Sequence, residues 1–182
     1  LGNALVAPVI AYVPEGDAER RSGHMAYAGT ITLSDETYMR LLEAAARSFK
    51  AHGFREIVLL GESGGNQAPQ TRIASELSKV WAGHGVRVLN AAAYYGANGG
   101  DAHLKAEGET AATIGTHAGI RDTSELMAVA PEGVRLASAG VNAQGATGDA
   151  RRASVARGRA LLALKVAAAV AEVRAWRAAT PR

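Results

Sequence analysis

The sequence contains no cysteine, and phenylalanine, tyrosine and tryptophan together make up only 5% of its 182 residues. Without cysteine, thiol catalysis, disulfides and thiolate metal sites are excluded, so a bound metal ion would need histidine and carboxylate ligands. The sequence also lacks an apolar run of about 18 residues and the ordered segments of a signal peptide. These absences argue against a membrane span or a secretion signal within this stretch, and they leave the compartment open.

What the sequence does contain fits one α/β domain over residues 1–182. Hydrophobic residues make up 48% of the chain, which is enough to bury a sizeable core. Apolar, β-branched runs predict strands at 5–13, 30–33, 57–60 and 86–89. Helical patterns predict helices at 34–53, 69–83, 123–129 and 151–177, with a glycine-rich loop or lid at 94–108. The alternation predicts a mainly parallel sheet with helices on both faces.

Basic residues are concentrated at the C-terminal end. Residues 151–182 hold eight basic side chains against the single acid Glu172, whereas the first 150 residues hold 12 basic and 16 acidic ones. Such a cluster could attract nucleic acid or an acidic partner. Because the aromatic residues of a base-stacking surface are absent, the solvated face of a C-terminal helix is the favoured interpretation. We therefore expect no nucleic-acid partner and no membrane partner.

The stretch VLLGESGGNQ, residues 58–67, contains Gly61, Ser63 and Gly65 at the spacing of a nucleophile elbow. In a parallel sheet, ligands bind beyond the carboxyl ends of the strands, so this loop is expected at the functional edge. A serine nucleophile would also need an acid and a base, here Asp101 with His103 or His117. No histidine follows residue 117, so the last third of the chain would contribute nothing. A metal-free serine hydrolase using Ser63 is therefore an alternative.

Four segments resemble, in order and spacing, the signatures of the creatininase family. They are SGHMAYAGTITLS (22–34), HGFREIVLLGESGGNQ (52–67), GTHAGIRDTSELM (115–127) and GATGDARRAS (145–154). The family signatures usually read as His followed by Phe-Pro-Gly-Thr, as Asn-Gly-His-Gly-Gly-Asn after a strand, as His-Ala-Gly followed by Glu-Thr-Ser, and as Gly-Asp-Pro. Four ordered matches are far more specific than one five-residue pattern.

The resemblance implies a three-layer α/β/α fold and a divalent-metal amidohydrolase that opens cyclic or linear amide C–N bonds. Zinc or manganese would activate a water molecule and polarise the amide carbonyl. The implied partners are a small-molecule amide and further copies of the chain in a homo-oligomer. The family also has an earlier signature, an acidic and His-containing segment that supplies several metal ligands, and this one is expected upstream of Leu1 on a strand and helix. An N-terminal fragment of the same protein is therefore a further candidate partner.

The sequence departs from the family pattern at two candidate ligands. Ser63 stands where the family has a metal-binding histidine, and Asp122 stands where it has glutamate. A neutral hydroxyl is a poor replacement for imidazole, so the metal site is expected to be altered or incomplete. A non-catalytic binding or scaffolding member of the family is therefore a second alternative.

The signatures nominate the site residues. The candidates are His117, Glu62 and Ser63 for catalysis, His24, Gly64, Gly65 and Asn66 for substrate binding, and Glu62 and Asp122 for metal binding. Structural roles are the alternatives for five of them. These are a helix cap for Asp122, a surface ion pair for Glu62, a hydrogen-bonded structural histidine for His24 and for His117, and ordering of its own loop for Asn66.

Overall fold

The computed structural model describes residues 1–140 and 145–179. The chain forms two compact units, the first from Leu1–Ala97 with the C-terminal stretch from Ala169, the second from Asn98–Ala168. The expectation of a single domain over 1–182 stays a prediction. No helix of the described residues is both long and apolar enough to cross a membrane.

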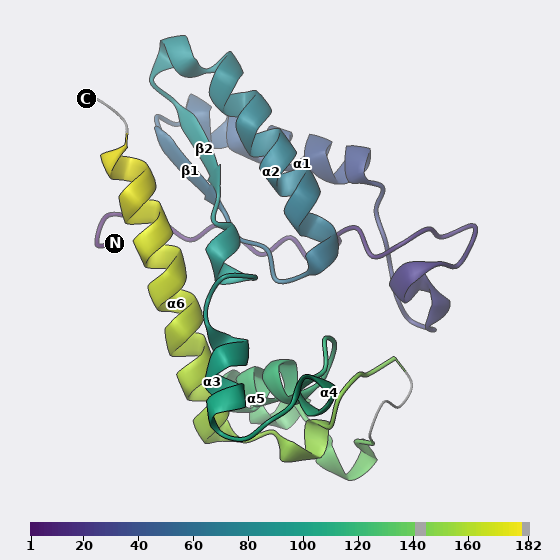
Figure 1. The fold of residues 1–182 in the computed structure, drawn as a ribbon. Coiled ribbons are helices and arrows are strands. Elements are labelled where there is room, and N and C mark those ends of the chain that lie inside the picture. Colours follow the sequence, from purple (N-terminus) through teal and green to yellow (C-terminus); the bar gives the residue numbers. More distant parts are fainter. Residues whose placement is uncertain (141–144, 180–182) are drawn as a thin grey trace. The chain divides into compact units, whose positions relative to one another are not determined.

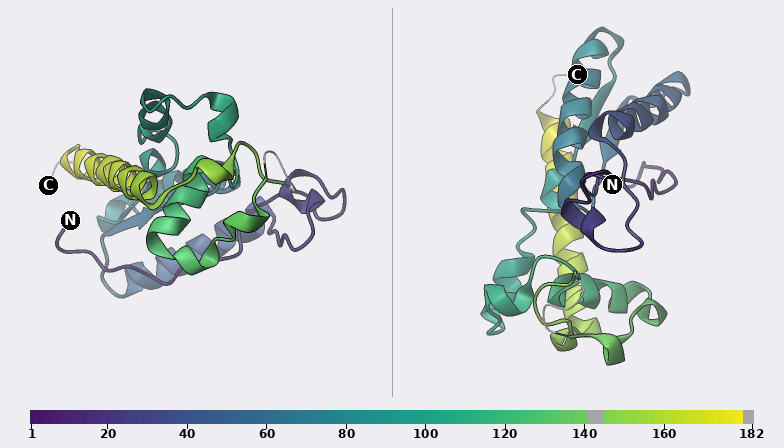
Figure 2. Two further views of the ribbon diagram at one scale, coloured as in Figure 1. Left: turned by 90° about the horizontal axis from the view of Figure 1, so that it is seen from below. Right: turned by 90° about the vertical axis from the view of Figure 1, so that its right-hand side faces the viewer.

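The first unit is built on a parallel pair of strands, β1 (Glu56–Leu59) and β2 (Arg87–Asn90), paired from Glu56↔Arg87 to Leu59↔Asn90. They are connected through α2 (Gly64–Val80), and α1 (Asp35–Ala51) precedes them. Helix α1 begins where predicted, because the Ser34 hydroxyl accepts a hydrogen bond from the Thr37 N–H at 3.2 Å. Two further views show α1 and α2 side by side (Figure 2).

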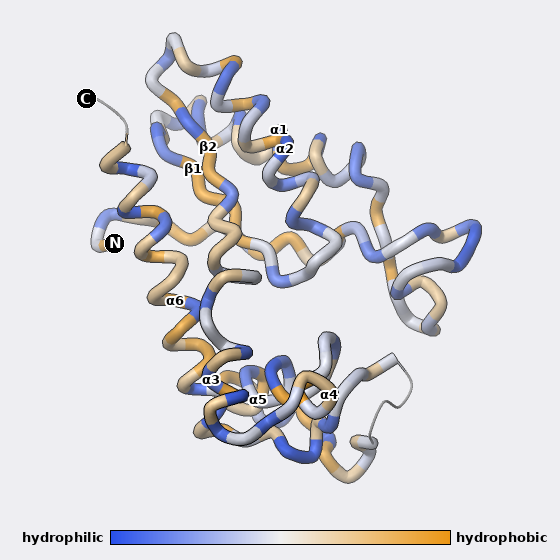
Figure 3. Tube along the Cα trace, viewed as in Figure 1, coloured by the Kyte–Doolittle hydropathy of each residue, from blue (hydrophilic) through white to orange (hydrophobic). Residues whose placement is uncertain are grey.

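Helices cover both sides of this sheet within the first unit. Helices α1 and α2 lie on one side, and the C-terminal stretch of α6 (Val155–Ala178) lies on the other (Figure 1). The buried core of α1, α2 and the strands includes Tyr38, Leu42, Ile57, Ile73, Leu77, Trp81 and Val88. Figure 3 shows the contrast between the mainly hydrophobic strands and the polar loop that follows β1. The predicted α/β fold with a parallel sheet is therefore confirmed.

The second unit is helical among its described residues. It contains α3 (Gly100–Ala106), α4 (Ala111–Ile114), α5 (Ile120–Val129) and the first part of α6. Its buried apolar cluster consists of Leu104, Ile114, Ile120 and Leu161. Short 3-10 turns occur in both units, at Gly23–Ala26, Ala82–His84, Ala92–Tyr94, Pro131–Gly133, Leu136–Ser138 and Ala150–Arg152.

Several predicted elements are wrong. Residues 5–13 and 30–33 are not strands, because they share a single backbone hydrogen bond, from Leu33 N–H to the Val13 carbonyl at 3.2 Å. Helix α2 begins at Gly64 instead of near Pro69, and α3 lies inside the predicted loop 94–108. The C-terminal basic residues are not simply a solvated face, since Lys165 is 1% exposed and its ammonium lies 2.5 Å from the Glu125 carboxylate.

Candidate functional site

The loop after β1 is shaped by the start of α2. Ser63 is the N-cap residue, with an extended backbone, and its hydroxyl accepts a hydrogen bond from the Gly65 N–H at 3.4 Å. Its carbonyl accepts the Asn66 N–H at 3.3 Å. The first turn of α2 carries no acidic residue, so its backbone N–H groups form a partially positive end close to Ser63. Ser63 is thus a helix cap at the position where the family signature has histidine.

Side-chain amides hold this loop from beneath. Asn66 and Gln70 are buried, at 4% and 2% exposure. The Gln67 amide nitrogen donates to the carbonyls of Gly61 at 3.1 Å and Ser63 at 3.2 Å, and to the Asn66 side-chain oxygen at 3.0 Å. Asn66, predicted to bind substrate, is therefore one of the buried side chains that support the loop. The sequence analysis did not identify Gln67 and Gln70 as supports of this loop. Gln67 is the last residue of the second signature, and Gln70 lies beyond it.

The N-terminal segment passes directly over the first turn of α2 (Figure 1). The Pro14 carbonyl oxygen lies 2.3 Å from the point that a Cβ at Gly65 would occupy, so only glycine permits this approach. Gly64 faces the Tyr95 hydroxyl, 3.2 Å from its own Cβ position. Glu62 is exposed on the same loop. Gly64 and Gly65, predicted to bind substrate, thus lie where two neighbouring segments meet the end of α2.

We expect Ser63→Ala to lower the free energy of unfolding by only about 0.5–1 kcal/mol, because the capping bond is long. Ser34→Ala is the matched control, since Ser34 caps α1 in the same way. Urea unfolding measures both costs. A fluorophosphonate probe is expected to form no adduct at Ser63 in the wild-type chain. Covalent labelling that disappears in Ser63→Ala would show that Ser63 is a nucleophile and not a simple cap.

His24 lies on the 3-10 turn Gly23–Ala26 and is bound by the segment that crosses α2. Its Nδ1 forms a short contact with the Glu15 carboxylate, and its backbone N–H donates to the Glu15 carbonyl at 2.9 Å. The side chain of Glu15 is 19% exposed and that of His24 is 42% exposed. His24 is therefore a partly exposed imidazole with a carboxylate partner that the sequence analysis did not identify.

In the second unit, His117 lies on an exposed turn that is hydrogen-bonded to Thr147 of the fourth signature. The Thr147 hydroxyl accepts the N–H groups of Thr116 at 2.7 Å and His117 at 2.9 Å, and the Thr147 N–H donates to the His117 carbonyl at 2.8 Å. Ala118 has a left-handed backbone with φ of 47°, which is rare for a residue other than glycine. Thr147 thus joins the third and fourth signatures around one strained turn.

Asp122 completes this turn from the first turn of α5. Its carboxylate accepts the Ala118 N–H at 2.7 Å, and the Thr123 hydroxyl donates to the Ala118 carbonyl at 3.2 Å. This bond lies in the turn before α5 and is not a helix cap, because the N-cap residue Gly119 has no side-chain capping bond. The Asp122 carboxylate therefore helps to hold the strained residue in place.

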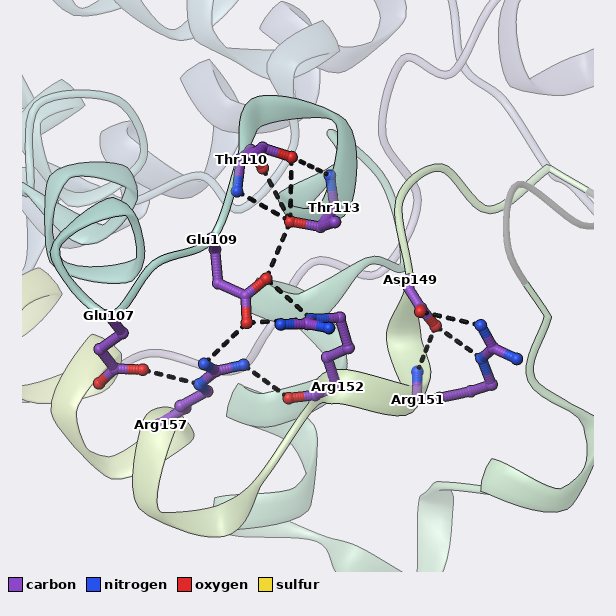
Figure 4. A network of polar contacts seen from close by, with 8 residues as sticks. All are labelled: Glu107, Glu109, Thr110, Thr113, Asp149, Arg151, Arg152 and Arg157. Atoms are coloured by element: carbon purple, nitrogen blue, oxygen red, sulfur yellow. Dashed lines mark hydrogen bonds and ion pairs between the residues drawn. The ribbon is translucent and has the colours of Figure 1, made fainter.

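A network of ion pairs supports the same unit (Figure 4). The Glu109 carboxylate, with its side chain 1% exposed, accepts hydrogen bonds from Arg152 at 2.8 Å and from Thr113 at 2.8 Å, and pairs with Arg157 at 2.8 Å. The Arg152 guanidinium is the main reason that the pKa of Glu109 falls from 4.5 to about 2; burial opposes the shift, and Thr113 and Arg157 add to it. Glu109 thereby ties α4 to the fourth signature and to the start of α6.

We expect Glu109→Gln to destabilise the second unit by about 1–3 kcal/mol at neutral pH, a range discounted because Arg152 is half-exposed to screening solvent. A lowered folded-state pKa stabilises the fold above about pH 4.5 and loses its effect as the pH falls towards 2. The difference between wild type and Glu109→Gln should therefore shrink over this window. Urea unfolding followed by far-UV circular dichroism measures it, with exposed Glu132→Gln as the control; a constant difference down to pH 2 would contradict the assignment.

The described residues, 1–140 and 145–179, do not fit a metal centre. They include no group of three or more histidine, aspartate or glutamate side chains that could hold a metal ion, whereas a catalytic metal takes roughly three protein ligands. The serine at the family's imidazole position caps α2 instead.

Asp101 and His103, the acid and base that a Ser63 nucleophile would use, form ion pairs with other residues. Asp101 pairs with Arg121 at 3.0 Å, and His103 lies 3.1 Å from the Glu107 carboxylate, all within the second unit. These ion pairs give Asp101 and His103 structural roles in α3.

Comparison with known proteins agrees with the four signatures. The family model Creatininase, described as creatinine amidohydrolase, matches residues 1–173. A crystal structure of creatinine amidohydrolase is similar with a TM-score of 0.75 and 21% identity, covering 98% of this chain and 77% of that one. A manganese creatininase gives 0.72 and 20%, covering 92% and 74%. A putative creatinine amidohydrolase from Bacteroides fragilis gives 0.61 and 21%, covering 87% and 66%.

No curated protein matches the chain. At about 20% identity the solved structures are evidence for the fold alone. The family model is evidence for the family, because it spans nearly the whole sequence and includes all four signature segments. The chain belongs to the creatininase (creatinine amidohydrolase) family.

Proposed function

We propose that the chain is an amidohydrolase that cleaves the C–N bond of a small cyclic or linear amide. Membership of the creatinine amidohydrolase family supports the reaction class. One solved relative is described as a creatininase mutant complexed with creatine. We therefore propose a ligand of similar size, a small nitrogen-containing compound. A homo-oligomeric state is part of the proposal.

The observation that carries the proposal is the construction of the His117 turn. An exposed imidazole is presented on a turn that contains a strained non-glycine residue, Ala118, and is braced by Thr147 and Asp122. Strained backbone that its surroundings hold in place is concentrated at functional sites. Amide hydrolysis needs a group that accepts a proton from water and returns one to the leaving nitrogen, and imidazole can do both near neutral pH. We assign this proton transfer to His117.

The start of α2 supports binding of a carbonyl group. Backbone N–H groups at a helix N-terminus donate to negatively charged or polar oxygen atoms. Glycine at 64 and 65 places no side chain over these donors; the Ser63 oxygen atoms accept the Gly65 and Asn66 N–H groups, and the Pro14 carbonyl lies against Gly65. Such donors stabilise the oxyanion that develops during attack on an amide carbonyl. This loop and His24 are the substrate-binding part of the proposal.

The metal dependence of the reaction is tested together with the proposal. Solved creatininases include manganese and zinc forms. The described residues of this chain do not supply three protein ligands. The proposed roles of His117 and the α2 loop are therefore stated for the protein groups alone.

The test is an NMR assay of the purified chain against a panel of small cyclic and linear amides that includes creatinine. Each amide is incubated with added zinc, with added manganese and with a chelator. We expect hydrolysis of at least one amide, and the chelator arm measures how much of it needs a metal. No hydrolysis under any condition would contradict the proposal.

A non-catalytic binding role is the second candidate, and one observation favours it. Ser63 and Asp122 stand at two positions where the family signatures have His and Glu. Ser63 caps α2, and Asp122 accepts the Ala118 N–H in the turn before α5, so both have structural bonds. Saturable binding of an amide without turnover, with or without metal, would identify this role.

A further inference from the structure

Residues 16–22 form a surface loop whose two ends lie against each other on the first unit. The loop closes between two glycines with positive φ, Gly16 at 129° and Gly23 at 63°. A Cβ at Gly16 would lie 2.1 Å from the Ser22 carbonyl oxygen, and one at Gly23 would lie 3.1 Å from the Gly16 Cα. Only glycine permits this approach, so the loop leaves the fold and returns to it at one point.

The tip of this loop is exposed, and its backbone is bonded only within the loop. Every residue from 17 to 23 is exposed, and residues 16–22 form neither helix nor strand. The Asp17 carboxylate accepts the N–H groups of Glu19 at 2.9 Å and Arg20 at 2.8 Å. The Asp17 carbonyl accepts the Ser22 N–H at 3.2 Å. Opening of the tip therefore removes no side chain from the core, and such segments open at a low free energy.

Two consecutive arginines, Arg20 and Arg21, lie at this tip. The Arg20 side chain is 85% exposed, and its guanidinium is 3.8 Å from the Asp17 carboxylate. Arg21 has a left-handed backbone with φ of 51°, which is strained in a residue other than glycine. A protease binds its substrate as an extended chain, so opening of the tip also releases this strain. Trypsin-like proteases recognise the arginine before the cut bond through an acidic pocket.

Most other basic residues are poor sites for such a protease. They lie in α1, α2, α3, α5 and α6, where helical hydrogen bonds hold the backbone. Arg87 lies in β2, and Arg151 and Arg152 lie in a 3-10 turn. Arg135 is the best comparison, because it is exposed between two 3-10 turns of the second unit, but it has no basic neighbour and its φ is −114°.

Both sides of the tip are anchored to the first unit. Before the loop, the Glu15 N–H donates to the Thr32 hydroxyl at 2.9 Å. After the loop, the His24 N–H donates to the Glu15 carbonyl at 2.9 Å, and the Thr30 hydroxyl donates to the His24 carbonyl at 2.9 Å. A cut between these anchors breaks the chain and leaves the segment on each side of the cut bonded to the fold.

We propose that the pair of Arg20 and Arg21 is a processing site for an arginine-specific endoprotease of the trypsin type. Hydrolysis adds one water molecule across the peptide bond after Arg20 or Arg21, giving an arginine carboxylate and a new amino group. The product is a two-chain form in which the N-terminal piece stays bound through its anchors. This inference is independent of amide hydrolysis by the chain.

The first experiment is limited digestion of the folded chain with a trace of trypsin, followed over time by mass spectrometry of denatured samples. We expect the first cut after Arg20 or Arg21, and we expect size-exclusion chromatography to keep both pieces in one peak. A first cut anywhere else, including after Arg135, or separation of the two pieces, overturns the proposal.

The second experiment compares the double variant Arg20→Gln with Arg21→Gln and the single variant Arg135→Gln. All three arginines are exposed in loops, so the melting curves should match that of the wild type. The initial rate of the first cut is expected to fall at least about 10-fold in the double variant, because the protease pocket loses its charged partner. Arg135→Gln should be cut at the wild-type rate. An unchanged rate in the double variant, or an equal fall in both variants, overturns the proposal.

Discussion

Gly115→Ala is expected to lower the free energy of unfolding of the second unit by about 3–5 kcal/mol, through backbone strain and overpacking together. Gly115 has φ of 72°, and a Cβ there would lie 2.0 Å from the Thr147 carbonyl oxygen and 2.7 Å from the Gly148 nitrogen. The three atoms nearest to this Cβ position all belong to backbone, so no rotamer change relieves the clash. The substitution pushes the third signature away from the fourth and should release the His117 turn.

Gly108→Ala is the matched control for this effect. Gly108 lies in the same unit with φ of 90°, but nothing lies within 4 Å of its Cβ position. It shares the strain and lacks the clash, so we expect a cost of about 1 kcal/mol. Both tryptophans, Trp81 and Trp176, belong to the first unit, so urea unfolding should be followed by far-UV circular dichroism. An equal loss of unfolding free energy in Gly115→Ala and Gly108→Ala would contradict the close packing of the third signature against the fourth.

His117→Ala is expected to lower kcat/KM for the responsive amide by about 10²–10⁴-fold, the usual contribution of a general acid–base group. Thermal stability should change little, because the His117 side chain is exposed and the Thr147 bonds involve only its backbone. Steady-state kinetics and a melting curve on the same preparation separate chemistry from folding.

His52→Ala is the control for the loss of an exposed histidine. His52 is exposed and is the C-cap residue of α1 in the first unit. Its removal should leave kcat/KM within about twofold of wild type, well inside the range attributed to a lost catalytic group. Full activity in His117→Ala, or equal losses in the two variants, would exclude His117 from the chemistry.

Local signals predicted much of the fold correctly. Ser34 marked the start of α1, and the apolar runs around Ile57 and Val88 became the two parallel strands. Helix α2 was placed too late because Gly64 and Gly65 suggested a loop, whereas the Ser63 cap and the amides beneath stabilise a helical turn there. The run at 5–13 has strand-like residues, but strands need backbone partners, and composition cannot supply them.

Site residues could be predicted only where a single sequence signature contains them. His117 was found from its own motif, but its clasp by Thr147 joins residues 30 positions apart, which spacing alone does not reveal. Glu15 was missed for the same reason, since its contact with His24 depends on how the loop between them folds back. Lys165 was counted with a solvated basic face because a sequence shows charge and not the buried partner Glu125.

The most direct test of amide hydrolysis by this chain is mass spectrometry of the reaction product formed in 18O-labelled water. The account predicts that wild-type chain converts at least one small amide of the panel into a carboxyl product that has gained one labelled oxygen, above a buffer control. If no labelled product appears with zinc, with manganese or without metal, the chain does not hydrolyse the amides tested, and the proposed function is wrong.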